Sequence, residues 1–239
     1  MPVSASASAS ASVPAPASAP ARLWLVRHAQ PLVAPGVCYG RLDLPADAAA
    51  TAASAQALAA ALPASVRLAH HSPLQRCEQL AQALQALRPG LALKPEARLQ
   101  ELDFGTWEGC AWDAIGRAPV HAWTADFAHH RPGGGESLAH MLGRVAAALA
   151  AARLQCDSAA ATAGGSRDVL WITHAGVARC VQWLLEQSQH QHQHQHQHPR
   201  QHSAGDGGGG APLPRADQWP LAAPKWGAWQ VVELGPQGG

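Results

Sequence analysis

The chain has 239 residues, of which 47% are hydrophobic, and its 17 basic and 16 acidic residues give a formal net charge of +1. This is enough chain for one catalytic domain with a substantial core. The near-neutral charge excludes a global field that would attract nucleic acid or an anionic membrane. The five cysteines are scattered and form no C-x-x-C pair, which fits neither a disulfide framework nor a zinc site and predicts a reducing, cytoplasmic location.

Residues 1–21 form a tail of Ala, Ser and Pro that we expect to be disordered. The tail lacks the basic region and the leucine-rich stretch of a secretory signal. Its many serines and its lack of acidic residues leave a transit peptide open as an alternative, although the segment has no amphipathic face. No apolar run in the chain approaches the roughly 18 to 20 residues of a membrane span, so we expect a soluble protein with no membrane partner.

Strand and helix patterns alternate in the first half of the chain. Leu23–Val26 is a short apolar run typical of a strand, and the alanine-rich stretch Ala46–Leu62 favours a helix. Val66–Ala69 predicts a second buried strand. The pair Ser72 and Pro73 predicts the start of a second helix, because a capping residue is followed there by proline.

The second half repeats this alternation after an irregular interval. Residues 107–132 are rich in glycine, proline and tryptophan and predict a cover over the sheet without regular elements. Ser137–Leu154 has a helical pattern, Val169–Thr173 indicates a third buried strand, and an apolar helix follows through Leu185. Residues 22–188 therefore predict one α/β catalytic domain with a mostly parallel sheet and helices on both faces.

The remaining chain contains one segment that cannot build a core. Gln189–Pro214 combines a Gln-His repeat with a glycine run, which predicts a disordered insertion over 189–214. The alternative that its histidines chelate a transition metal stays open. In residues 215–239, Gly227–Leu234 has the composition of a strand and predicts an edge strand that closes the same sheet.

Polar side chains follow the predicted strands at the points where the strands end. Arg27 and His28 follow the first strand, His71 and Ser72 the second, and His174 the third. Ligands of an open α/β sheet bind outside the carboxyl ends of its strands, so we expect a binding site there. Histidines in these places are hard to explain as packing, because a buried imidazole must satisfy both ring nitrogens.

Four segments carry a resemblance to a known family. They are LVRHAQP at 25–31, SPLQRC at 72–77, LQELDFGTWEG at 99–109 and THAG at 173–176. In this order and context they resemble the histidine phosphatase family, which is also called the phosphoglycerate mutase-like family. The resemblance implies a three-layer α/β/α fold, a phosphohistidine intermediate, and neither a metal nor another cofactor.

The resemblance also implies a role for each of five residues. His28 is the nucleophile, and a neutral imidazole suits that role because it can attack phosphorus and later depart protonated. Arg27 and Arg76 hold the phosphoryl oxygens with paired guanidinium donors, and His174 is a further phosphate ligand of the catalytic group. Glu101 gives a proton to the leaving alkoxide.

Two departures from the family pattern affect the predicted reaction. Ala29 stands where the family commonly has glycine, and Gln30 stands where mutases usually carry an acidic residue. We therefore predict a histidine acid phosphatase-type hydrolase that acts on a small-molecule phosphomonoester. The alternatives are a phosphoglycerate mutase-type phosphotransferase and a catalytically silent binding module on the same fold. For Asp103 and Glu108, in the loop that bears the acid, structural hydrogen bonds are the favoured role.

Two further segments suggest a substrate. GVCYGRLDLP at 36–45 and RPGGGES at 131–137 resemble alpha-ribazole phosphatases, which act in cobalamin biosynthesis. In this interpretation Arg41 supplies a further phosphate contact, and Tyr39 or a tryptophan of the cover stacks on a planar base. The alternative is that Arg41 caps a loop and that the tryptophans only pack. Glu136 is expected to be a first-turn acid of the following helix rather than a catalyst. The sequence does not indicate an oligomeric state.

Overall fold

The computed structural model describes residues 20–160, 166–197 and 212–235. Its strands are β1 (Arg22–Arg27), β2 (Leu68–His71), β3 (Ala92–Pro95), β4 (Asp168–Thr173) and β5 (Trp229–Glu233). They form one five-stranded sheet in the order β3-β2-β4-β1-β5. The first four strands in that order are parallel to their neighbours, and β5 joins β1 antiparallel. The predicted α/β class with a mostly parallel sheet is confirmed.

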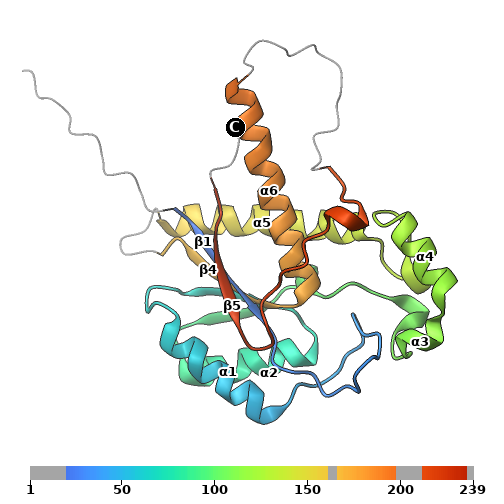
Figure 1. Ribbon diagram of the computed structural model, residues 1–239. Coiled ribbons are helices and arrows are strands. Elements are labelled where there is room, and N and C mark those ends of the chain that lie inside the picture. Colours follow the sequence, from blue (N-terminus) through green and yellow to red (C-terminus); the bar gives the residue numbers. More distant parts are fainter. Residues whose placement is uncertain (1–19, 161–165, 198–211, 236–239) are drawn as a thin grey trace, which may run out of the picture.

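Helices cover both faces of this sheet. They are α1 (Ala48–Ala61), α2 (Gln75–Leu87), α3 (Trp112–Ile115), α4 (Arg117–Ala125), α5 (Leu138–Ala160) and α6 (Ala175–Gln197). The α1 and α2 helices lie on one face, α5 and α6 lie on the other, and α3 and α4 lie to one side (Figure 1). Short 3-10 turns occur at Ala97–Leu99, Gly105–Trp107, Pro132–Gly134 and Ala216–Gln218. This is the three-layer α/β/α arrangement.

Alternating side chains of β1 build two separate cores. Leu23 and Leu25 are buried with apolar side chains of α5 and α6, whereas Trp24 and Val26 are buried with those of α1 and α2. All six residues of β4 are buried. A central parallel strand that is covered on both faces is expected to be apolar throughout, and this is why the sequence signal for β4 is clear.

Among the differences from the sequence-based predictions are a strand that was not predicted and a helix that begins later than predicted. The sequence does not predict β3, because this exposed strand contains Lys94 and Pro95 and pairs only with β2. The α2 helix begins at Gln75 instead of at the predicted pair Ser72 and Pro73. The backbone N–H of Ser72 donates to a carbonyl of β4 at 2.9 Å, so Ser72 still belongs to the sheet.

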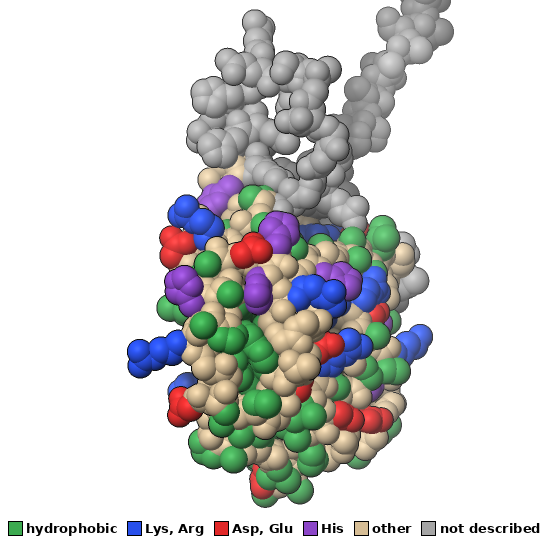
Figure 2. Space-filling view, turned by 90° about the vertical axis from the view of Figure 1, so that its right-hand side faces the viewer, with side chains coloured by type: hydrophobic (Ala, Val, Ile, Leu, Met, Phe, Trp, Pro, Cys, Tyr) green, Lys and Arg blue, Asp and Glu red, His purple; other side chains and the backbone are tan. Residues whose placement is uncertain are grey.

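The cover at residues 107–132 contains two helices, where the sequence predicted none. The α4 helix accommodates Pro119 because the proline lies in its first turn, where its missing N–H has no helical partner. Gly116, with a φ of 81°, separates α3 from α4. Figure 2 looks onto the side of the molecule where these helices lie and shows hydrophobic side chains at the surface among charged and histidine side chains of mixed type.

The α6 helix continues to Gln197, beyond the predicted end at Leu185 and into the segment predicted to be disordered. Glutamine is a good helix former, and extending an existing helix avoids the cost of nucleation. The rest of the predicted insertion, 198–211, and residues 1–19 of the predicted tail lie outside the described residues. Within the described ranges neither α6 nor any other helix has the length and apolar character needed to cross a membrane.

The core beneath α5 generates a stability prediction. Leu149 is 1% exposed and Leu154, on the same helix, is 60% exposed. Leu149→Ala should lower the free energy of unfolding by about 2 to 5 kcal/mol, because it removes buried methyl groups and leaves a cavity. The matched control Leu154→Ala should change it by less than about 0.5 kcal/mol. Urea denaturation of both variants provides the measurement, and equal losses would contradict the assigned core.

Candidate active site

The parallel pairing of β1 and β4 places two histidines side by side. Arg27 and Thr173 are register partners, and the next residues along the two strands are His28 and His174. The backbone N–H of His28 donates to the Thr173 carbonyl at 3.0 Å, and the two imidazole ring centroids are 5.1 Å apart. The strand ends therefore bring together His28, His174 and the neighbouring Ser72, as the sequence pattern predicts.

The hydrogen bonding of His28 defines which ring nitrogen is available. His28 is 2% exposed, and its Nδ1 lies 2.6 Å from the carbonyl oxygen of Ala29. A carbonyl only accepts, so Nδ1 carries the proton and Nε2 carries the lone pair. Burial, followed by the positive charge of Arg76, lowers the pKa of His28 to about 3. The ring is thus neutral near pH 7, with Nε2 free to act as a nucleophile.

His174 is held by groups behind the site. It is 1% exposed, its Nε2 lies 2.8 Å from Ser72 Oγ, and the thiol of Cys77 lies 3.5 Å from the same nitrogen. Burial, followed by the charge of Arg76, lowers the pKa of His174 well below its usual value. In this structure His174 is therefore a neutral ring that can donate through one nitrogen. The sequence analysis did not identify Ser72 and Cys77 as its partners.

Two arginines have donors directed at no protein group. Arg76 is fully buried, and its guanidinium donates to the carbonyls of Leu42 at 2.8 Å and Gly40 at 2.5 Å. Within the described part of the chain, the buried Nε atoms of Arg76 and Arg27 have no hydrogen-bond partner. Burial lowers the pKa of Arg27, but a guanidinium stays charged near neutrality. Unused buried donors of this kind are suited to an anion.

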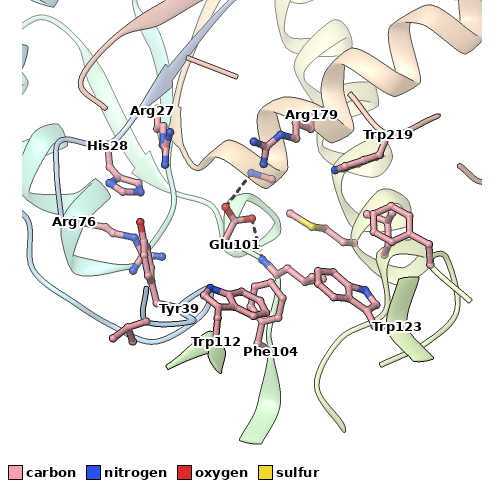
Figure 3. A pocket seen from close by; sticks show the side chains of 16 residues that line it. Arg27, His28, Tyr39, Arg76, Glu101, Phe104, Trp112, Trp123, Arg179 and Trp219 are labelled. Atoms are coloured by element: carbon pink, nitrogen blue, oxygen red, sulfur yellow. Dashed lines mark hydrogen bonds between the residues drawn. The ribbon is translucent and has the colours of Figure 1, made fainter. Parts of the chain in front are cut away.

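Glu101 also lines this cavity, and Figure 3 shows it between the group of His28 and Arg76 and the side that holds Arg179. Its Oε2 accepts from the Gly176 backbone N–H at 2.9 Å, and its Oε1 accepts from the Leu102 backbone N–H at 3.1 Å. Gly176 is in the first turn of α6. A Cβ at this glycine would overlap Oε1 of Glu101, so the absence of a side chain lets the carboxylate approach the helix.

The cavity has a volume of about 390 Å³ and two chemically different parts. Figure 3 shows Arg27, His28, Tyr39 and Arg76 grouped at one end, with Arg179 and Trp219 at the other. The aromatic side chains that line it are Tyr39, Phe104, Trp112, Trp123, Phe127 and Trp219. The sequence analysis predicted Tyr39 and the tryptophans of the cover as stacking or packing candidates but missed Phe104, Phe127 and Trp219.

Arg179 lines the cavity but lies in none of the sequence segments that carry the family resemblance. It lies on α6, and its Nε is buried with no hydrogen-bond partner among the described residues. Its Nη2 makes a long contact of 3.4 Å with the Leu221 carbonyl. It lies three residues after Gly176, which also lines the cavity, and this spacing, which places both residues on one face of α6, was the only sequence signal.

The loop residues predicted from the resemblance occupy different places. Tyr39 lines the cavity, and its ring centroid is 5.7 Å from the Arg76 guanidinium carbon. Arg41 is exposed and lies 3.5 Å from Asp103; it is not among the residues lining this cavity, and its substrate contact stays a prediction. Glu108 accepts four backbone N–H groups, from residues 40, 41, 42 and 104. Its role is structural, as expected.

The described residues contain no group of three or more His, Cys, Asp or Glu side chains that could hold a metal ion. The five cysteines all lie in the described part of the chain, and all are free thiols. The polar groups that converge on the cavity are therefore arginine, histidine and glutamate side chains together with backbone N–H groups. Such a set can bind an oxyanion, supply a nitrogen nucleophile and exchange a proton.

The lowered histidine pKa values generate a prediction about pH and stability. An unfolded histidine binds a proton below about pH 6.5, whereas folded His28 does so only near pH 3. The stability of the fold should therefore be complete above pH 6.5 and should fall as the pH drops from 6.5 toward 3, because the unfolded chain binds more protons. The slope should approach about 1.4 kcal/mol per pH unit for each such histidine.

Urea denaturation at pH 7.5 and 5.5 measures this dependence. His28→Asn should lose a smaller amount of stability between the two pH values than the wild type, since one of the buried neutral rings is gone. His121→Asn, at an exposed position, is the matched control and should keep the wild-type difference. An unchanged difference in His28→Asn would show that His28 is not held neutral by the fold.

Comparisons with known proteins agree with this geometry. The model of the histidine phosphatase superfamily, branch 1, matches residues 23–205. A mycobacterial glucosyl-3-phosphoglycerate phosphatase is 26% identical with a TM-score of 0.57, and the match covers 67% of this chain and 77% of that chain. A phosphoglycerate mutase from Thermus thermophilus is 30% identical with a TM-score of 0.51, over 68% and 84% of the two chains.

A further structure, of the mycobacterial phosphatase in complex with inorganic phosphate, is 26% identical with a TM-score of 0.56, over 67% of this chain and 76% of that chain. A search of curated proteins found no match. The family match and the structural neighbours support a phosphatase-type enzyme that hydrolyses or transfers phosphoesters. The chain, matched by the family model over most of its length, belongs to branch 1 of the histidine phosphatase superfamily.

Proposed function

We propose that the protein hydrolyses a small-molecule phosphomonoester through a phosphohistidine on His28. The observation that carries the proposal is the bond from His28 Nδ1 to the Ala29 carbonyl, at 2.6 Å, which leaves a neutral Nε2 lone pair at the cavity. Arg27 and Arg76 line the same end of the cavity, where their guanidinium groups would bind the phosphoryl oxygens. His174 would add one further donor.

In the first step, Nε2 of His28 attacks the phosphorus in line with the ester oxygen. The N–P bond forms, the P–O ester bond breaks, and the leaving oxygen takes a proton from Glu101. Arg27 and Arg76 stabilise the charge on the peripheral oxygens of the transferring group, a task that many phosphotransferases give to a metal ion. The Ala29 carbonyl stabilises the positive charge on the phosphorylated imidazole through the Nδ1 proton.

In the second step, a water molecule replaces the leaving alcohol. Glu101 takes a proton from the water, the new P–O bond forms, and the N–P bond breaks to restore neutral His28 and release inorganic phosphate. The same carboxylate therefore serves as acid and then as base, as microscopic reversibility requires. We also place the reaction in the cytoplasm, a proposal supported by the five free thiols.

The apolar part of the cavity supports a phosphatase over a phosphoglycerate mutase. Phosphoglycerates are small and carry a carboxylate as well as a phosphate, whereas one wall here consists of aromatic side chains including Phe104, Trp112 and Trp123. Such a wall favours a large ester with a planar or apolar leaving group. Alpha-ribazole 5'-phosphate, a precursor in cobalamin biosynthesis, has a planar base of that kind and is the specific substrate that we propose. Because one similar structure is that of a phosphoglycerate mutase, transfer of the phosphoryl group to another hydroxyl is the second candidate function.

Removal of the nucleophile tests the covalent step. His28→Asn should abolish release of inorganic phosphate from every ester, and quenching of the wild type during turnover with an alkaline denaturant should trap on His28 a phosphate that later acid treatment releases. The assay should run equally well in excess chelator, because Arg27 and Arg76 supply the positive charge and His174 supplies a further hydrogen-bond donor. Labelled phosphate on a serine or cysteine, or activity that requires added magnesium, would contradict the mechanism.

A substrate panel tests the proposed leaving group. Phosphate release should be compared for alpha-ribazole 5'-phosphate, 3-phosphoglycerate and a short alkyl phosphate, with alpha-ribazole 5'-phosphate giving the highest kcat/KM. Trp112→Leu should raise KM for alpha-ribazole 5'-phosphate about 5- to 100-fold, since stacking on a base is worth about 1 to 3 kcal/mol, and should change KM for the alkyl phosphate little. Isomerisation of phosphoglycerate without phosphate release would establish the mutase instead.

A further inference from the structure

Glu101 lies between two cavities. The first is the one that contains His28; the second, of about 260 Å³, lies on its other side. The residues lining the second cavity include Arg41, Arg98, Gln100, Glu136, His140 and Arg144. Every arginine among them is ion-paired with an acidic side chain. The second cavity is therefore a set of supporting contacts behind Glu101 and not an evident anion site.

Arg144, on α5, uses all five of its N–H donors in these contacts. Its side chain is 15% exposed and that of Glu136 is 11% exposed. Two of the bonds, both 2.8 Å, join the guanidinium to the carboxylate of Glu136. The other three reach the backbone carbonyls of Arg98 at 2.7 Å, Gln100 at 2.7 Å and Glu101 at 3.2 Å. The planar guanidinium thus fixes the main chain on both sides of the Glu101 side chain.

The segment that carries Glu136 packs against the loop that follows Glu101. The backbone N–H of Glu136 donates to the Asp103 carbonyl at 2.8 Å. A Cβ at Gly135 would overlap that carbonyl oxygen, and a Cβ at Gly133 would overlap the carbonyl oxygen of Phe104. The glycines of the RPGGGES segment therefore let one backbone lie directly against another. Main-chain contact with residues 133–136 therefore supports the loop that follows Glu101.

We propose that Arg144, fixed by Glu136, is a positioning residue for Glu101 and sets the efficiency of proton transfer to the leaving group. The inference rests on the proposed function of Glu101 as general acid. Neither Arg144 nor Glu136 lines the cavity with His28, so neither contacts the reacting atoms. Their effect passes through the backbone carbonyls of Gln100 and Glu101. A proton donor displaced by about 1 Å can lose on the order of 100-fold in rate.

Leaving-group dependence separates this role from a general contribution to folding. An alkyl phosphate needs a proton on its departing oxygen, whereas an aryl phosphate such as 4-nitrophenyl phosphate departs as a stable anion. Glu101→Gln should therefore slow alcohol release from the alkyl ester by about 10² to 10⁴ and slow the aryl ester much less. The pre-steady-state burst of alcohol or phenol reports this step before dephosphorylation limits turnover.

Arg144→Lys keeps a positive charge but cannot form the forked contacts. It should lower the burst rate for the alkyl ester about 10- to 100-fold, lower that for the aryl ester by less than about 3-fold, and leave KM for both nearly unchanged. In the double variant with Glu101→Gln, Arg144→Lys should cause no additional loss, since the proton donor is already absent. Glu136→Gln, a milder change of the same pair, should show the same selectivity with a smaller loss.

Arg22→Lys provides the matched control. Arg22 forms the same kind of bidentate pair, with Asp168 at 3.0 and 2.6 Å, but at the start of β1, away from the cavity. This variant should lower Tm without changing the ratio of alkyl to aryl rates. The inference would be overturned if Arg144→Lys and Glu136→Gln lowered the burst rates of the alkyl and aryl esters equally. It would also be overturned if the rate loss in the double variant were the product of the losses in Arg144→Lys and Glu101→Gln. Either result would leave the proposed function intact. A wild type that releases phosphate from no ester would refute the proposed function and the inference with it.

Discussion

The buried positive charge of Arg76 is the constraint on which the rest of the site depends. Its side chain is fully buried, its hydrogen-bond partners are carbonyl oxygens, and no ion pair joins it to a carboxylate in the described part of the chain. Burying a charge without a counter-ion costs free energy. The field of Arg76 also helps to keep His28 and His174 neutral, so the site favours a bound anion and a nitrogen nucleophile at the same time.

The carbonyls that accept from Arg76 are themselves held in place by an acidic side chain. Glu108 accepts the backbone N–H groups of Gly40 and Leu42, the two residues whose carbonyls bind the guanidinium. The Glu108 carboxylate, which lies close to this loop, also offsets part of the buried charge of Arg76. It does so without contacting Arg76, and a direct contact would occupy guanidinium donors that a bound phosphate needs. Glu108 therefore acts by holding the loop that binds Arg76, and it does so without lining the cavity itself.

Sequence reasoning located the residues that follow strands and, through the resemblance, Arg76, Glu101 and Tyr39, but it missed other residues that reach the site from elsewhere. Arg27, His28 and His174 were predictable, because the ends of buried parallel strands meet at one edge of the sheet. Arg179 and Trp219 enter the cavity from α6 and from the segment after the insertion, and only tertiary packing brings them there. Likewise α3, α4 and β3 contribute no fully buried side chain, so no stripe of core residues marks them in the sequence.

The two ends of the cavity impose different requirements on one ligand. The end with Arg27 and Arg76 suits a compact anion, whereas most side chains that line the other end are aromatic and offer few hydrogen bonds. An ester whose leaving group is large and apolar satisfies both ends together. Its departure would leave the phosphohistidine facing an emptied apolar space, which water can enter but which offers little to hold a small polar acceptor alcohol. This asymmetry favours hydrolysis over return of the phosphoryl group to a second hydroxyl.

The carboxylate of Glu101 lies against the first turn of α6. This position suits both of its proposed roles, as acid toward the leaving group and as base toward water. In the proposed mechanism Glu101 first gives a proton to the leaving oxygen. After the proton has gone to the leaving oxygen, the Gly176 N–H and the dipole of α6 stabilise the anion that remains. That anion is the base that the water step needs. A carboxylate that must alternate in this way cannot be fixed by a permanent ion pair of its own, so its backbone is fixed instead, through the carbonyls that Arg144 binds.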